Sequence, residues 1–542
     1  MQPLSLGRDA LDRHDWAAAR AAYEEAVSRA PSGEGFEGLA VALFWLSDAD
    51  AAFQAMERAY VHYRREGLPG RAALAALWLA GQYIRIRGNA SPARGWASRC
   101  ERLLADAGHC AEAGRILLIR AVAGGAWAEI EAAAERAIEI AREFGDSDGE
   151  LLGLAYSGLA LVSTGHVREG LERLDEAMAG ATGGEVRSPE TVGQIFCAVL
   201  SGWERTTDLD RAEQWNQVAQ PFLVAYERTG MTGSCRAIYA ALLVAAGRWG
   251  DAERELLLAL SAFDQGAPAM RGDALVRLAE LRLKQGRLDE AKALLEGQET
   301  HPDAQAPLAA LELARGRPKV AAALLERRAR QLDPRDLQQG PLLLRLVEAH
   351  IAAGDVAAAA AAAARLRAAV DPDLHSSRGI AHMAEGLVRR AQGGEAVSEL
   401  ERALALLERA RMSYEAAEAR LALAECAAHG NPELAVREAR TALAVLAGLG
   451  ARPAADRAAA LLRSLGHAVP ARSASAATLS RREQEVARLV SLGLSNDQIA
   501  AQLFLSRRTV EHHVSSILRK LDASTRAEIA VYAVRELRAE PV

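Results

Sequence analysis

The sequence predicts an all-α protein, in which a long array of stacked helix pairs precedes a small helical domain of different character. Residue types that favour helices, alanine above all, dominate the 542 residues. No segment alternates Val, Ile, Thr and Tyr as half-buried strands do. A chain of this length exceeds a single core, so we expect several domains or an extended repeat.

A short pattern recurs along residues 1–465, which we predict to form the helical array. A small or turn-forming residue and a polar or small residue precede a hydrophobic position, and a small residue often follows ten places later. Most neighbouring copies are roughly 30 to 42 residues apart, the range of helix-pair repeats. Two gaps, after Asp15 and after Asp355, are about twice as long, so we expect one copy in each to have lost the pattern. The copies lie at 14–16, 88–90, 125–127, 165–167, 207–209, 247–249, 286–288, 316–318, 354–356 and 430–432.

The first copy shows how one helix pair should form. We expect the first helix to end near Arg13 and Asp15 to cap the next helix through its carboxylate. Trp16 and Tyr23 supply bulk, and Pro31 ends the helix. One pair cannot bury its apolar face alone, so the pairs should stack into a solenoid.

The segment HDWAAARAAYEEAVSRAP, residues 14–31, is similar to the second half of a tetratricopeptide repeat. The array therefore resembles tetratricopeptide repeats, although its later spacings exceed the usual length of about 34 residues. The resemblance implies an interaction surface for a protein or small-molecule effector whose identity the sequence does not give. Turn-rich breaks at 301–303 and 371–373 mark either sub-domain joints or longer loops.

The sequence carries no pattern typical of an enzyme, a cofactor site or a metal site. It contains no GxxxxGK[ST] phosphate loop and no HExxH, so we predict no enzymatic activity and no cofactor. The first twelve residues lack the cationic start and apolar core of a signal peptide, and no apolar run reaches about 18 residues, so we expect a cytoplasmic protein without a membrane span. Five scattered cysteines favour buried thiols in a reducing compartment: Cys100, Cys110, Cys197, Cys235 and Cys426.

Residues 466–477, GHAVPARSASAA, lack apolar periodicity and are predicted to be a flexible linker. Residues 478–542 then show dense helix-capping patterns. Ser480–Glu483 and Ser495–Gln498 are capping boxes, and Gly493 suits the left-handed position after a helix. These patterns predict two helices whose inward residues are Val486, Leu489, Val490, Ile499, Ala500 and Leu503.

A third and a fourth helix complete this domain. Residues 504–506 form a tight turn, and Ser506 caps a third helix that runs to about Leu521. Ser524 starts the fourth helix, with Ile529 and Ala533 inward. A short helix, a three-residue turn and a longer helix predict a helix-turn-helix.

The third helix, residues 507–521, has two distinct faces at 100° per residue. Its apolar face predicts the core, and its opposite face is polar and cationic, as suits the major groove. Local cations outnumber local anions, which predicts phosphate contacts and salt-sensitive binding. The apolar face contains Val510, Val514, Ile517 and Leu521. The outer face contains Arg508, His512, Ser515, Ser516 and Arg519, with Thr509 and Glu511 on its flanks and Arg507, Lys520 and Arg526 as further cations.

The pattern LSxREQEVxxLVxxGLSNxQIAxxLxLSxRTVExHVxxILxKL resembles the LuxR-type DNA-binding domain across all four helices. The resemblance implies a sequence-specific transcription regulator that binds promoter DNA through the third helix, usually as a dimer associating through the fourth. Thr509 would then meet phosphate, while Glu511, His512 and Ser515 face base edges. Many members carry lysine where this chain has Glu511, whose carboxylate can accept from cytosine N4. The full set predicted to contact DNA is Asn496, Arg507, Arg508, Thr509, Glu511, His512, Ser515, Ser516, Arg519 and Lys520.

A helical array before such a domain also resembles the large ATP-binding LuxR regulators typified by MalT. Those begin with an ATPase module, whereas this chain begins inside the first repeat without a phosphate loop. We therefore expect either a reduced member or a truncated gene product, without ATP-dependent switching.

Two interpretations of the whole chain remain open at this level. The favoured one is a regulator whose array controls the DNA-binding domain; the alternative is a protein-interaction scaffold with a vestigial DNA-binding domain. Residues 478–542 carry a formal charge of +2 and the preceding residues −8. This contrast motivates the expectation that the array masks the DNA-binding helices until an effector binds.

Overall fold

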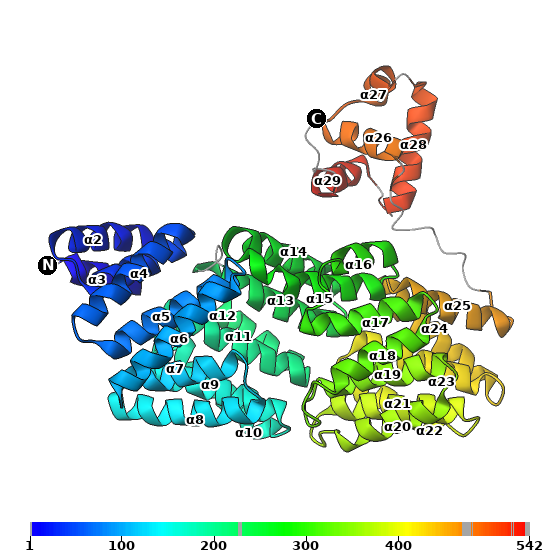
Figure 1. Ribbon diagram of the computed structural model, residues 1–542. Coiled ribbons are helices and arrows are strands. Elements are labelled where there is room, and N and C mark those ends of the chain that lie inside the picture. Colours follow the sequence, from blue (N-terminus) through cyan, green and yellow to red (C-terminus); the bar gives the residue numbers. More distant parts are fainter. Residues whose placement is uncertain are drawn as a thin grey trace. The chain divides into compact units, whose positions relative to one another are not determined.

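The computed structural model describes residues 3–225, 230–468, 479, 481–503, 505–521, 523 and 525–536. Every regular element in these ranges is a helix, which confirms the all-α prediction (Figure 1). The chain divides into two compact units, Met1–Leu461 and Leu462–Val542. Residues 469–477 of the expected linker lie outside the described ranges, so the predicted boundaries at 465 and 478 stay predictions.

The first half of the array consists of helices joined by short turns. Their bounds are α1 Pro3–Asp12, α2 Trp16–Arg29, α3 Gly33–Trp45, α4 Ala49–Arg65, α5 Pro69–Arg85, α6 Ala90–Ala107, α7 Ala111–Val122, α8 Trp127–Phe144, α9 Ser147–Ser163, α10 Val167–Thr182, α11 Pro189–Thr206 and α12 Leu209–Ala225.

The second half continues in the same way, with two short 3₁₀ turns added. Its elements are α13 Gly230–Ala245, α14 Trp249–Gly266, η1 Pro268–Met270, α15 Arg271–Lys284, α16 Leu288–Leu295, η2 Pro302–Ala304, α17 Gln305–Ala314, α18 Pro318–Ala329, α19 Gln339–Ala352, α20 Val356–Ala368, α21 His375–Ala391, α22 Val397–Arg409, α23 Ser413–Ala427, α24 Pro432–Leu449 and α25 Arg452–Ser464.

Each copy of the recurrent sequence pattern lies at the turn that begins the second helix of a pair. The hydrophobic third position is the first residue of the helix, as Trp16 is for α2 and Trp249 for α14. The first position usually has a positive φ, which glycine adopts without steric cost. His14 and Thr207 take this conformation without being glycine, at φ +59° and +57°. The pattern therefore marks a backbone shape as well as a residue preference.

The turn between α3 and α4 contains a copy of the pattern that sequence reasoning missed. Ser47 has φ +63°, and Asp48 caps α4 by accepting from the Ala51 amide at 3.2 Å. Ala49 begins the helix and the fully buried Ala59 follows ten places later. Serine in the left-handed position hid this copy, which fills the long gap after Asp15.

The second long gap also contains a helix pair, α21 and α22. Gly393 has φ +75°, but three further residues separate it from the start of α22 at Val397. The longer connection removed the expected spacing, so this pair could not be recognised from the pattern. Both gaps thus hold the helix pair that their length predicted.

The first helix pair confirms its expected local chemistry. Helix α1 ends at Asp12, and Asp15 Oδ1 accepts from the Ala18 amide at 3.0 Å, which caps α2. Helix α2 ends at Arg29, just before Pro31. Tyr23 is buried between α1 and α3, as expected for a residue of the repeat core.

The array closes on itself, because distant helices share one apolar core. Residues 237–281, from α13 to α15, form a single cluster with residues 417–458, from α23 to α25. Ser413 Oγ donates to the Ala246 carbonyl at 3.2 Å across this junction. These contacts join segments about 170 residues apart. Stacking of neighbouring pairs alone does not predict such a closure.

The second unit contains α26 Arg481–Ser491, α27 Asn496–Leu503, α28 Arg507–Leu521 and α29 Arg526–Glu536. All four helices contribute to one apolar cluster, in which Val486, Ile499, Val510, Ile517 and Ile529 are fully buried. Every residue predicted to face inward belongs to this cluster. The four-helix domain and its core faces are therefore confirmed.

The described residues offer neither a membrane-spanning helix nor a metal-binding cluster. None of the helices there combines the length and apolar character needed to cross a membrane. No group of three or more His, Cys, Asp or Glu side chains in the same ranges is arranged to hold a metal ion.

Candidate nucleic-acid interface

Helices α27 and α28 are fixed by the caps that the sequence predicted. The Ser495 amide donates to Gln498 Oε1 at 2.8 Å, and the Gln498 amide donates back to Ser495 Oγ at 3.4 Å. Ser506 Oγ accepts from the Thr509 amide at 3.1 Å and begins α28. Gly493 has φ +79°, as required after α26. Together these caps define a helix-turn-helix, with α28 as its longer second helix.

The outer face of α28 is polar and open to solvent. Arg508, His512 and Ser515 are exposed, while Val510 and Ile517 on the opposite side are fully buried. Among the described side chains, these three exposed residues have no hydrogen-bond or ion-pair partner within the unit. Their donors and acceptors are therefore available to a ligand, as a base-reading surface requires.

Glu511, where a lysine is common in the resembling family, is neutralised inside the domain. Arg507 Nε donates to Glu511 Oε1 at 2.9 Å, and Arg507 Nη1 lies 3.3 Å from Asp497 Oδ2. The hydrogen bond to Glu511 raises the pKa of Arg507, which remains a cation. All three side chains are largely exposed, so the pairs are weak and can rearrange on binding.

Two further predicted contact residues, Ser516 and Asn496, also have partners within the protein. Ser516 is half-buried and donates to Glu483 Oε1 at 2.8 Å, so it lies on the packed side of α28 and not on its outer face. Glu483 itself is buried. Asn496 Oδ1 accepts from Arg526 Nη1 at 2.7 Å. Ser480, the partner of Glu483 in the predicted capping box, lies outside the described residues.

Arg526, predicted as part of the cationic patch, is a structural residue. Its Nη2 also donates to the Leu494 carbonyl at 2.6 Å, so one guanidinium ties the start of α29 to the turn before α27. Arg482 acts similarly, because its Nη2 donates to the Leu503 carbonyl at 2.6 Å at the end of α27. Residue identity alone could not separate these cations from those facing solvent.

Some residues predicted to belong to this face or to cap its helices lie outside the described residues. The backbones of Arg519 and Lys520 belong to α28, but their side chains are outside the described set. Phe504 and Ser524 are also outside it. Helix α29 begins at Arg526, and Thr525 Oγ1 accepts from the Glu528 amide at 3.4 Å, so Thr525 holds the capping position expected of Ser524.

A four-helix unit that contains such a helix-turn-helix is typical of DNA-binding domains. Comparison with known protein families identifies the type of domain. Residues 477–533 match the family model described as bacterial regulatory proteins, luxR family. The C-terminal unit is thus a luxR-type regulatory domain, as its sequence pattern predicted.

Curated relatives of this chain match it over a short stretch. The uncharacterized transcriptional regulatory protein YhcZ of Bacillus subtilis (strain 168) is 46% identical over 57 residues, covering 10% of this chain and 27% of that protein. The transcriptional regulatory protein LiaR of the same organism is 43% identical over 58 residues, covering 11% and 28%. This chain therefore spans about a quarter of the length of the curated relatives it matches.

Solved structures align with more of the chain, at low sequence identity. The APC/C hetero-tetramer Cut9–Hcn1 aligns over 84% of this chain and 95% of that chain, with 13% identity and a TM-score of 0.35. At that level the alignment supports no detailed comparison. The tetratricopeptide-like character of the array rests on its own helix pairs and turns.

Proposed function

We propose that this protein is a sequence-specific DNA-binding transcriptional regulator, with α28 in the major groove and its activity controlled by the helical repeat array. The observation that carries the proposal is the exposed face of Arg508, His512 and Ser515 on the second helix of a luxR-type helix-turn-helix. Polar side chains on that helix can read base edges, while nearby cations contact phosphate.

Genome-wide mapping of bound DNA, followed by fluorescence anisotropy on the recovered fragments, tests this proposal. We expect the wild type to bind its sites more tightly than scrambled DNA by about a thousandfold or more. The double variant Arg508→Ala, His512→Ala should lose most of this preference. Arg330→Ala, which removes a cation from the array, is the matched control. Equal binding by the double variant and the control would refute the assignment of α28.

Dimerisation through α29 is the second part of the proposal. A dimer with two-fold symmetry would place two copies of α28 on half-sites about one helical turn of DNA apart. Inverted repeats at that spacing should therefore dominate the mapped sites. Single half-sites bound with full affinity would exclude the dimer.

Control by the array is the third part, and its support is the charge contrast between the two segments. Residues 478–542 carry +2 and the preceding residues −8, which favours masking of the DNA-binding face. Because the second unit has its own closed core, the fragment 478–542 should fold alone. We expect it to bind DNA more tightly than the full chain. A folded fragment without salt-dependent DNA affinity would instead favour the scaffold with a vestigial domain.

A further inference from the structure

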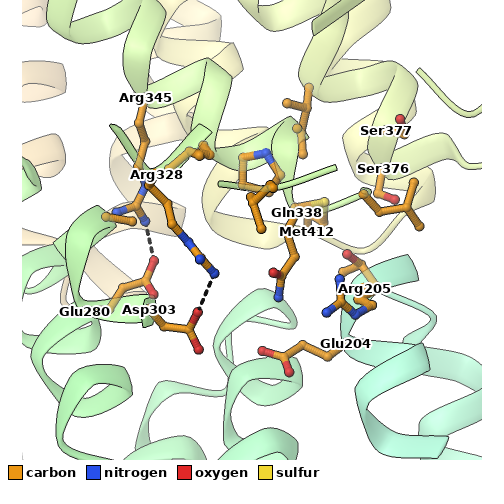
Figure 2. A pocket seen from close by; sticks show the side chains of 18 of the residues that line it. Glu204, Arg205, Glu280, Asp303, Arg328, Gln338, Arg345, Ser376, Ser377 and Met412 are labelled. Carbon is orange, nitrogen blue, oxygen red and sulfur yellow. Dashed lines mark hydrogen bonds and ion pairs between the residues drawn. The ribbon is translucent and has the colours of Figure 1, made fainter. Parts of the chain in front are cut away.

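A cleft with a volume of about 270 Å³ lies inside the repeat array (Figure 2). Its walls come from α11, α15, α18, α19 and α21, so residues more than 200 positions apart meet around it. The turn-rich break at 301–303 lines it through Asp303, and Leu374, the residue after the break at 371–373, lines it as well. These breaks therefore shape a cavity within the first unit.

Four arginines line the cleft, and each is paired with a carboxylate. Arg328 Nη2 lies 3.1 Å from Asp303 Oδ1, and Arg345 pairs with Glu280 (Figure 2). Both terminal nitrogens of the third arginine, Arg277, donate to the carboxylate of Glu204 in a bidentate pair.

The fourth arginine, Arg205, presents its charge to the cleft with its counter-ion behind it. Arg205 Nη1 donates to Asp336 Oδ1 at 2.7 Å, and the guanidinium stacks 4.6 Å from the Trp127 ring centre. Asp336 is only 2% exposed and does not line the cleft. Its carboxylate also accepts from Trp127 Nε1 at 3.0 Å and from the Gln338 amide at 2.9 Å. The lining thus holds four cations against three anions.

Three of these arginines keep donors for a ligand. Arg205, Arg328 and Arg345 each use one guanidinium nitrogen for the carboxylate partner, and a guanidinium has five N–H donors. The side-chain amide of Gln338 points into the same space and has no hydrogen-bond partner among the described residues (Figure 2). The carboxylates have less to offer, because both oxygens of Glu204 are already occupied.

Part of the remaining wall of the cleft is apolar. Val276, Leu342, Ile380 and Met412 line it and are each at least nine-tenths buried within the array. An adjoining cavity of about 200 Å³ shares Arg205, Arg277 and Gln338 with the first and continues it towards α13. Ser234 Oγ, buried without a hydrogen-bond partner in the described structure, lines this second cavity. An unsatisfied hydroxyl at such a place is typical of a site that a ligand or water completes.

Stability alone does not account for this arrangement. Apolar residues of similar size would often hold these helices together at least as well as partly buried ion pairs, which lose solvation. Arginine's planar donors instead suit carboxylate and phosphate groups. We propose that this cleft binds a small amphipathic anion, whose carboxylate or phosphate group accepts from unused arginine donors of the lining and whose apolar body packs on Leu342 and Ile380.

The binding test uses the DNA-free full chain and defined probes. Isothermal titration with octanoate, octyl phosphate, octanamide and inorganic phosphate separates the contributions of charge and apolar body. We expect saturable one-to-one binding of at least one octyl anion, and at least tenfold weaker binding of octanamide. If inorganic phosphate binds as tightly as octyl phosphate, the apolar wall has no role and the proposal fails. Failure of both octyl anions to bind below about 1 mM also overturns it.

Two variants locate the site, and neither leaves a fully buried charge without its partner. Arg328→Gln deletes a donor whose partner Asp303 is 52% exposed, and Gln338→Glu adds a near-isosteric carboxylate that competes for the arginines. Each should weaken anion binding about ten- to hundredfold. The control is Arg330→Gln, which lies two residues along the chain and outside the cleft lining. Circular dichroism melts confirm that all three are folded, and equal affinity of the two cleft variants and the control would refute the site.

A regulatory role for this anion rests on the proposed function, and a separate measurement tests it. Anisotropy with a mapped DNA site, with and without the octyl anion, should show a changed DNA affinity in the wild type and none in Gln338→Glu. Anion binding without any change in DNA affinity would leave the cleft as a binding site and exclude it as the regulatory one. Loss of DNA binding in all samples would refute only the proposed function.

Discussion

Replacing Arg526 by alanine should destabilise the C-terminal unit, although the sequence places this cation in a DNA-binding patch. The change removes two charge-assisted hydrogen bonds, to Asn496 Oδ1 at 2.7 Å and to the Leu494 carbonyl at 2.6 Å. Such bonds contribute about 1.5–3 kcal/mol each. Arg526 is only half-buried and water can replace part of the loss, so we expect a destabilisation of about 2 kcal/mol for the pair.

The fragment 478–542 offers a direct assay by thermal denaturation. A loss of about 2 kcal/mol lowers the Tm of a domain this small by about 8–16 °C. Arg508→Ala in the same fragment is the control, since its exposed side chain should change stability by less than about 0.5 kcal/mol. A Tm drop below about 4 °C for Arg526→Ala, or an equal drop for both, would show that the tie to α27 does not hold the unit together.

Three further predictions test other parts of the structure. Burial and the charge of Glu418 raise the pKa of Glu348 to about 7. The stability that protonated Glu348 contributes is therefore present at low pH and lost as the pH rises through 7. Glu348→Gln should raise the Tm at pH 8 and leave it unchanged near pH 4. Gly158→Ala places a Cβ 2.7 Å from the Gly170 carbonyl and should cost about 1–3 kcal/mol in chemical denaturation, whereas Gly81→Ala, with open space, should stabilise by up to about 1 kcal/mol. Arg508→Gln should reduce the salt slope of DNA binding by about 0.9 for each phosphate that the side chain no longer neutralises, and the paired Arg507→Gln should reduce it by less.

Local chemistry made much of this fold predictable. Caps such as Ser506 and Asp15 act within three residues, so a short sequence window contains all the information they need. The inward face of α28 follows from helical periodicity alone, and Val510 and Ile517 are fully buried as expected. Most of the repeat turns that the sequence revealed have glycine at the left-handed residue. The copy at Ser47 was missed, since serine takes the left-handed conformation there in place of the glycine found in most copies.

Features built from distant segments were not predictable. Closure of the array joins α13–α15 to α23–α25, and no local pattern records which helices meet across such a distance. The anion cleft has the same origin, since Arg205 and Arg345 come together only in the folded array. Ser516 was misplaced for a subtler reason. Ser516 lies at the boundary between the polar and apolar faces of α28. Its hydrogen bond to the buried Glu483 holds its side chain against the rest of the domain.

The roles of the arginines show why counting charges is a poor guide to a binding surface. The sequence of the C-terminal unit offers Arg507, Arg508 and Arg526 as equivalent cations near one helix. In the structure one is paired with carboxylates, one faces solvent and one caps backbone and amide oxygens. Only a cation that is not already paired with a carboxylate can neutralise phosphate and release counterions from DNA at full strength. The same reasoning applies in the array, where the cleft arginines matter through the donors that their carboxylate partners leave unused. Function at both sites therefore depends on unsatisfied hydrogen-bonding capacity, which is a property of the fold and not of the composition.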